Sequence, residues 1–218
     1  SNLRDMVTLL HEGGHAVHSL VTRDLLLNSF KNTPSEVAEL ASMSMELITM
    51  DFWDEFFDNE ADLKRAKIQH LESIIETLPW VATIDKFQHW MYENPQHTAL
   101  ERTEEWVKIY SQFTDKVMDW TELEKFRKYL WQRQLHIYEV PFYYIEYGIA
   151  QLGAIGVWKN YRENPQKGLE GYLSALKLGY TASITDIYAT ANIPFDFSQK
   201  NISELIQFVK NELDTLKL

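Results

Sequence analysis

Residues 3–21 read LRDMVTLLHEGGHAVHSLV. Like most of the chain, this stretch has the spacing of apolar residues that is typical of a helix. The apolar residues of this stretch return at intervals of three and four, which is the spacing of one face of an α-helix. They are Leu3, Met6, Val7, Leu10, Val17, Leu20 and Val21. The stretch therefore predicts an amphipathic helix that carries two histidines four residues apart, on one face.

Signals for the start of further helices recur downstream. A threonine stands three residues before a glutamate, as in a capping box, at Thr33 to Glu36, Thr98 to Glu101 and Thr121 to Glu124. Asn201 to Glu204 is a looser version of the same pattern. The chain has only 8 glycines and 6 prolines, about half of average usage, which favours long helices over a turn-rich β fold.

The sequence therefore predicts a single all-α domain over residues 1–218, with many helices and no linker. Pro79 should end or kink a long helix, because proline removes a backbone hydrogen bond and clashes with the preceding turn. No segment alternates as a strand of useful length, and no internal repeat is present. Helices are expected near residues 3–21, 34–57, 60–78, 80–93, 99–118, 122–134, 142–162, 166–177, 184–190 and 202–216.

The composition excludes several classes of function. With 21 basic and 32 acidic side chains the formal net charge is −11, which argues against a nucleic-acid or anionic-membrane partner. The chain has no cysteine, so any metal must be held by His, Asp or Glu. Without a long apolar run or the pattern of a signal peptide, the sequence predicts no membrane partner and a cytoplasmic location.

The sharpest motif is His11-Glu12-Gly13-Gly14-His15, an HExxH match on the first predicted helix. Two imidazoles four residues apart can converge on one zinc ion, with the adjacent glutamate placed to activate water. Gly13 and Gly14 each cost about 1 kcal/mol relative to alanine in a helix, so a ligand or a second backbone is expected to pass closely. The alternative is a helix with two incidental histidines. His18 is read as a core histidine or, less readily, as a support for the metal ligands.

A catalytic zinc needs a third protein ligand, and the acidic segment after Pro34 supplies candidates. We expect Glu39 to be that ligand, because small and apolar neighbours suggest that its carboxylate is buried and therefore has a partner. Glu46 lies seven residues further on the same face and could hydrogen-bond a ligand. Glu36 is expected to serve the capping box instead. An exposed acidic helix with no metal remains the alternative.

The segment from His136 to Tyr147 reads HIYEVPFYYIEY and is dense in tyrosine. On its own it is best explained as an aromatic core layer. Beside a zinc, however, a neutral histidine and tyrosine hydroxyls are suited to donate hydrogen bonds to the oxyanion of a tetrahedral intermediate. The functional interpretation therefore depends on the HExxH motif.

These three segments, in this order, resemble the catalytic region of the thimet oligopeptidase and oligoendopeptidase F family of zinc metallopeptidases, and most closely the oligoendopeptidase F branch. The resemblance implies a helical, zincin-type endopeptidase that cleaves oligopeptides in a deep channel. It also implies zinc ligation by His11, His15 and Glu39, with Glu12 as the general base. His136, Tyr143 and Tyr147 correspond to transition-state donors, and Tyr144 is an alternative to either tyrosine.

Only ten residues precede His11, whereas members of this family are more than twice as long. We therefore expect a fragment that lacks the N-terminal part of the catalytic domain and one wall of its substrate channel. Two other classes were considered. A ferritin-like di-iron bundle needs two Glu-x-x-His pairs, and only Glu12 to His15 fits. A non-catalytic helical interaction domain with a structural metal site is the main alternative. The sequence leaves the oligomeric state open.

Overall fold

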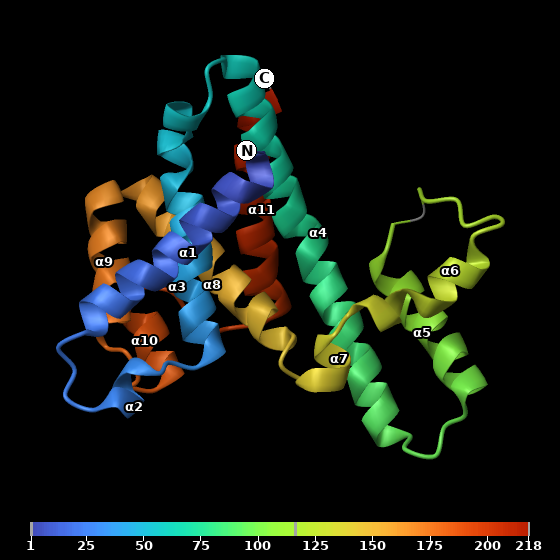
Figure 1. Cartoon of the computed structure of the whole chain (residues 1–218). Coiled ribbons are helices and arrows are strands. Elements are labelled where there is room, and N and C mark those ends of the chain that lie inside the picture. The colour runs from blue at the N-terminus through green and yellow to red at the C-terminus, as the bar shows by residue number, and fades with distance from the viewer. Residues whose placement is uncertain (1, 116, 218) are drawn as a thin grey trace. The chain divides into compact units, whose positions relative to one another are not determined.

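The computed structural model describes residues 2–115 and 117–217, and all regular secondary structure in that part of the chain is helical (Figure 1). The all-α prediction is therefore confirmed. The elements are α1 (Leu3–Thr22), α2 (Asn28–Lys31), α3 (Ser35–Ile48), the 3-10 helix η1 (Thr49–Phe56), α4 (Glu60–Glu93), α5 (Ala99–Phe113), α6 (Glu124–Tyr129), the 3-10 helix η2 (Leu130–Arg133), α7 (His136–Glu139), α8 (Ile145–Glu163), α9 (Pro165–Lys177), α10 (Ile184–Thr190) and α11 (Gln199–Lys217).

Several boundaries differ from the expected ones. The helix expected at 34–57 changes to 3-10 geometry at Thr49, and the one expected at 122–134 is a short α-helix followed by a 3-10 turn. The helix expected at 99–118 ends at Phe113, where the N–H of Thr114 still bonds the Tyr110 carbonyl. Of the remaining positions in that range, residue 116 lies outside the described residues.

The capping boxes are confirmed at one site and wrong at two. Thr98 and Glu101 form the reciprocal pair that starts α5. At α3 the N-cap is Pro34, so Glu36 stands one position too early to complete a box with Thr33. At α6 the N-cap is Leu123, and the Thr121 hydroxyl bonds an Asp119 carboxylate oxygen instead.

Two more helix ends were not anticipated. A box between Asn2 and Asp5 starts α1, with each side chain bonded to the backbone N–H of the other residue. The last helix begins at Gln199, before the expected cap at Asn201, and the Ser198 hydroxyl accepts the Asn201 N–H. A nearby hydroxyl can take the capping role, here Ser198 three residues before Asn201, which explains the earlier start of the last helix.

Of the two outcomes expected at Pro79, the end of a helix is wrong, because α4 runs through it from Glu60 to Glu93, and the kink stays a prediction. A proline in a helix interior loses one backbone hydrogen bond, but packing on the following turns can hold the helix together. Val81, Ile84 and Phe87 are buried immediately after it. Tertiary burial therefore overrides the local signal.

The chain divides into two compact units. The first comprises the chain up to residue 74 and from residue 149 onward, and the second comprises residues 75–148. The division lies within α4 and near the start of α8, and the prediction of a single domain stays a prediction. None of the helices formed by the described residues has the length and apolar character needed to cross a bilayer.

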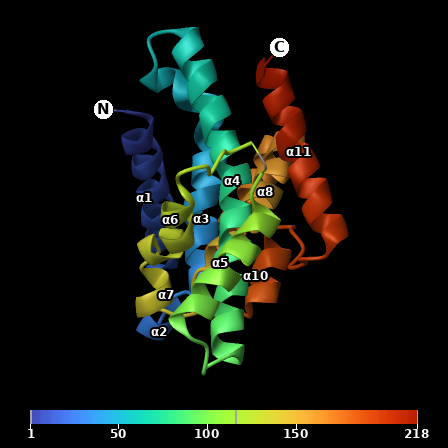
Figure 2. The same ribbon diagram turned by 90° about the vertical axis from the view of Figure 1, so that its right-hand side faces the viewer.

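The first unit is organised around α3. This helix contacts α1, α9 and α10, and α1 also contacts α9 (Figure 1). Figure 2 shows α1 and α3 from a second side. Helix α11 packs on α8 through an edge-to-face contact between Phe208 and Trp158. Fully buried side chains of the unit include Val37, Leu40, Leu47, Trp53, Ile155, Leu176, Ile187 and Val209. The central helix thus has apolar neighbours along most of its length.

Gly14 allows α1 to approach α3 closely. A Cβ atom at Gly14 would lie 2.5 Å from Ser42 Cα and 2.6 Å from the Ala41 carbonyl oxygen, whereas a Cβ atom at Gly13 would meet nothing within 4 Å. The Ala41 carbonyl also accepts a 2.7 Å hydrogen bond from the buried Tyr172 hydroxyl. The close backbone approach expected for the two glycines is therefore present at Gly14 and absent at Gly13.

The second unit has an aromatic core. Phe87, Trp106, Tyr110 and Trp131 pack against one another, and Trp106 Nε1 donates to the Arg127 carbonyl at 2.9 Å. The buried cluster comprises Ile84, Phe87, Trp106, Ile109, Tyr110, Trp131 and Ile137. Large rings bury much apolar area each, so a short chain segment can form a core of its own.

Candidate metal centre

Helix α1 places His11 and His15 one turn apart. Their ring centroids are 5.0 Å apart and the rings meet nearly edge to face. Both side chains are half-buried, on the side of α1 that faces α3. Because the Cβ atoms of residues four apart point the same way on a helix, one ion can contact both imidazoles.

Helix α3 contributes Glu39 to the same point. His11 Nε2 lies 3.3 Å from Glu39 Oε2, and one donor atom from each of His11, His15 and Glu39 lies within 4.8 Å of the others. Two ligands that hold zinc at about 2.0–2.1 Å with tetrahedral angles are about 3.3 Å apart. The donor set of two nitrogens and one carboxylate oxygen therefore fits a zinc ion.

Ser42 holds the Glu39 carboxylate. Its hydroxyl lies 3.1 Å from Glu39 Oε2 and 3.1 Å from the Glu39 carbonyl oxygen. Burial raises the pKa of Glu39, but the hydrogen bonds from His11 and Ser42 outweigh it and keep the pKa below its usual value. The carboxylate is therefore ionised at neutral pH, as a metal ligand must be.

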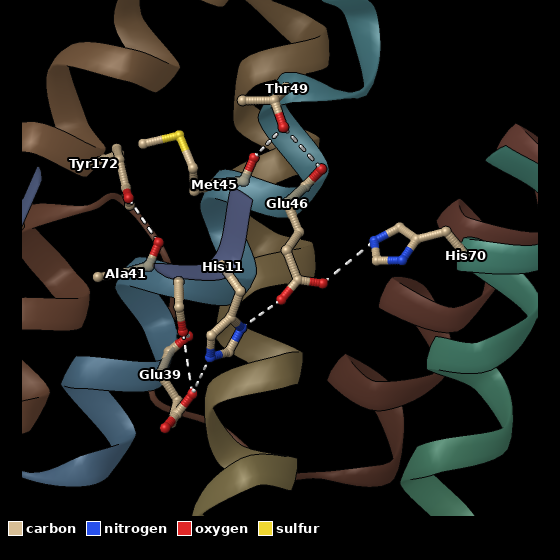
Figure 3. Close-up of polar contacts among 9 residues, drawn as sticks. His11, Glu39, Ala41, Met45, Glu46, Thr49, His70 and Tyr172 are labelled. Carbon is tan, nitrogen blue, oxygen red and sulfur yellow. Dashed lines mark hydrogen bonds and ion pairs between the residues drawn. The ribbon is translucent and has the colours of Figure 1, made fainter. Parts of the chain in front are cut away.

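Glu46 supports His11 from the other side of the ring. His11 Nδ1 and Glu46 Oε1 are 2.6 Å apart (Figure 3). The hydrogen bond to Glu39, followed by that to Glu46, raises the pKa of His11 to about 10. Negative charge on both sides of the imidazole stabilises positive charge there, which also favours a divalent cation at Nε2.

Glu12 and His18 occupy different environments on the same helix. Glu12 directly follows His11 and is exposed. His18 is 6% exposed, and burial lowers its pKa. The structure thus places His18 in the core, as the sequence favoured.

His136, Tyr143 and Tyr147 come together in the second unit. The His136 ring lies 5.9 Å from that of Tyr143 and 5.6 Å from that of Tyr147, and His136 Nε2 is 3.4 Å from the Tyr147 hydroxyl. His136 Nδ1 is 2.6 Å from Gln134 Nε2. Tyr144 also contacts the His136 ring, and burial raises the pKa of its hydroxyl. These side chains gather within residues 75–148, and the candidate metal ligands gather within the other unit.

One buried polar side chain near the site was missed by the sequence analysis. His70 on α4 is 5% exposed, and its Nε2 atom lies 3.6 Å from Glu46 Oε2. The available signal was its place among the buried residues Ala66, Leu71 and Ile74, which put a polar ring on an apolar face. Its partner could not be found, because helical periodicity does not show which distant residue an interior histidine meets.

Two histidines four apart on one helix, with a glutamate from a second helix beside them, are a donor set that can hold a metal ion. The family model identifies the class of protein as peptidase. The chain belongs to peptidase family M3, whose family model matches residues 2–205. The resemblance to the oligoendopeptidase F family is therefore confirmed.

Two curated relatives are similar to nearly the whole chain. An oligoendopeptidase F homolog of Borreliella burgdorferi is 25% identical over 231 residues, which cover 99% of this chain and 36% of the relative. The oligopeptidase PepF of Bacillus subtilis is 22% identical over 218 residues, which cover 100% of this chain and 32% of the relative. The chain thus spans about a third of the length of the curated relatives it matches.

Solved structures share the fold. PZ peptidase A with inhibitor 2 superposes with a TM-score of 0.83 and 32% identity, over 97% of this chain and 37% of that one. The oligoendopeptidase-F from Enterococcus faecium has a TM-score of 0.75 and 21% identity, over 99% of this chain and 39% of that one. The second likeness concerns the fold alone.

Proposed function

We propose that this chain carries the catalytic centre of a zinc-dependent endopeptidase that hydrolyses oligopeptides. The observation that carries the proposal is the gathering of donor atoms from His11, His15 and Glu39 within 4.8 Å of one another. Membership of peptidase family M3 supports it. The names of the relatives, oligoendopeptidase and oligopeptidase, support peptides as the substrate class.

The ligand count favours catalysis over a structural metal. Structural zinc sites are closed by four protein ligands, whereas catalytic sites use three and keep one position open. Among the described residues, the cluster at the crossing of α1 and α3 contains three donors. A bound zinc would supply an acidified water and a polarising charge for the scissile carbonyl.

Glu12 is proposed as the general base. It is exposed and adjacent to His11, so its carboxylate can accept a proton from the attacking water and later deliver it to the leaving amine. His136 and Tyr147 are proposed to donate hydrogen bonds to the oxyanion, with Tyr143 packed beside both. In this role the aromatic segment supplies chemistry as well as packing.

Peptide positioning is proposed to depend on more than this chain. The relatives are about three times as long as the region they share with it. Holding a substrate in register supplies a large part of the rate enhancement of an enzyme. We therefore expect the 218-residue chain to bind zinc but to cleave peptides slowly, and a version extended upstream to the length of the relatives to be faster.

Metal analysis and a quenched fluorescent peptide test the proposal together. We expect one zinc per chain, loss of cleavage on addition of a chelator, and recovery when zinc is restored. Glu39→Ala and His15→Ala should each lose stoichiometric zinc. Full zinc content in both variants would show that the metal site is wrong. Equal kcat/KM for the chain and the extended version would refute the proposed positioning role.

A further inference from the structure

Both oxygens of the Glu46 carboxylate face histidines from different helices. Oε1 lies 2.6 Å from Nδ1 of His11 on α1, and Oε2 lies 3.6 Å from Nε2 of His70 on α4 (Figure 3). All three residues belong to the first unit. Glu46 thus connects the proposed metal ligand His11 on α1 with His70 on α4.

His70 is built into the interior. It is 5% exposed, and its ring lies 5.3 Å from that of the fully buried Trp53. Burial lowers the pKa of His70, so the ring is neutral at pH 7 and carries one N–H. A buried N–H without an acceptor is costly, and Glu46 is the carboxylate that Nε2 faces at 3.6 Å. At that distance a small adjustment completes the hydrogen bond.

The backbone at Glu46 is fixed independently of its side chain. The Thr49 hydroxyl lies 2.7 Å from the Met45 carbonyl oxygen and 3.2 Å from that of Glu46, at the last turn of α3 (Figure 3). The carboxylate itself can still rotate about its side-chain bonds unless both of its oxygens are engaged. His11 takes one oxygen, so the histidine on α4 is placed to take the other.

We propose that His70 is a positioning residue, which donates from Nε2 to Glu46 and thereby holds the carboxylate that orients the His11 ring toward the metal. The inference rests on the proposed zinc site. A carboxylate that accepts from Nδ1–H fixes the tautomer in which Nε2 has the free lone pair, and partners of this kind typically change metal affinity about 10–100-fold.

Zinc affinity in two variants at position 70 tests this role. His70→Leu removes the donor, whereas His70→Gln places an amide N–H near the position of Nε2. We expect the Kd of zinc for His70→Leu to be about 10–100-fold higher than its Kd for the unaltered chain. His70→Gln should remain within about threefold of it, because the donor is kept. Zinc alone is the probe, measured by competition with a chelating dye.

Stability controls separate positioning from packing. Val209→Ala removes a fully buried side chain of α11 and should lower the melting temperature without changing zinc affinity. Equal zinc affinity in His70→Leu and the unaltered chain would overturn the inference. So would a His70→Gln variant that is as weak as His70→Leu at the same melting temperature. Failure of the site itself would appear differently, as stoichiometric zinc in His11→Ala.

Discussion

In the first unit His11 is held between two carboxylates, whereas in the second unit His136 lies against the rings of Tyr143, Tyr144 and Tyr147. The polar partners of the first histidine are carboxylates, whereas those of the second are the neutral Gln134 amide and the Tyr147 hydroxyl. Two carboxylates favour positive charge beside His11, and three tyrosine rings pack around His136. The difference predicts that substitutions of His11 and its carboxylate partners change zinc affinity, whereas substitutions in the aromatic cluster leave zinc affinity unchanged.

The largest effect is expected from Glu12→Gln. This change keeps the shape of the side chain and its hydrogen-bonding capacity but removes the base, so kcat should fall about 1,000-fold while zinc content stays unchanged. Parallel zinc analysis and peptide hydrolysis measure the two quantities. Activity near that of the unaltered chain would disprove the general-base role.

Substitutions of the aromatic cluster should lower kcat without releasing zinc. Tyr147→Phe and His136→Ala are each expected to reduce kcat about 100-fold, since each removes a proposed donor to the oxyanion. Tyr138→Phe is the matched control, because this tyrosine is 53% exposed and stacks on Trp131. If only the melting temperature changes in the first two variants, the segment is an aromatic core layer and no more.

The two glycines of the HExxH motif should respond in opposite directions. Gly14→Ala would drive a methyl group into the backbone of α3, and should cost about 1–3 kcal/mol in the free energy of unfolding. Gly13→Ala has open space around it and should gain about 1 kcal/mol through helix propensity. Urea denaturation of the metal-free protein measures both. Equal stability of the two variants would contradict the close helix crossing.

The smallest effect is expected from Glu36→Ala. Glu36 completes no capping box, because α3 starts at Ser35 with Pro34 as its N-cap. Its favourable interaction with the helix dipole is lost, which costs about 0.3–1 kcal/mol. Zinc binding should be unchanged. A zinc-free Glu36→Ala variant would show that the wrong glutamate of α3 has been taken as a ligand.

The sequence predicted well those features that depend on residues close together in the chain. The spacing of His11 and His15 follows from the helix period, and the apolar neighbours of Glu39 indicated its burial. Pro79 shows where local rules fail, since packing on its C-terminal side keeps α4 helical. Caps shifted by one residue at Pro34, because several neighbouring groups can begin a helix.

The role of His70 depends on an association of helices that no local pattern contains. Its own segment showed a histidine on an apolar face and nothing about Glu46. The same holds for Tyr172, whose hydroxyl reaches the Ala41 carbonyl from α9. Contacts of this kind become visible only when elements distant in sequence are brought together in space.

Ser42 takes part in two arrangements at once. Its Cα atom lies directly beneath Gly14 at the helix crossing, and its hydroxyl is 3.1 Å from the proposed ligand oxygen of Glu39. The closeness of the two helices and the position of the Glu39 carboxylate therefore both involve Ser42. Side chains of increasing size at position 14 should push α1 away from α3 by increasing amounts. If the proposed zinc site depends on the distance between the two helices, the dissociation constant of zinc should rise along this series.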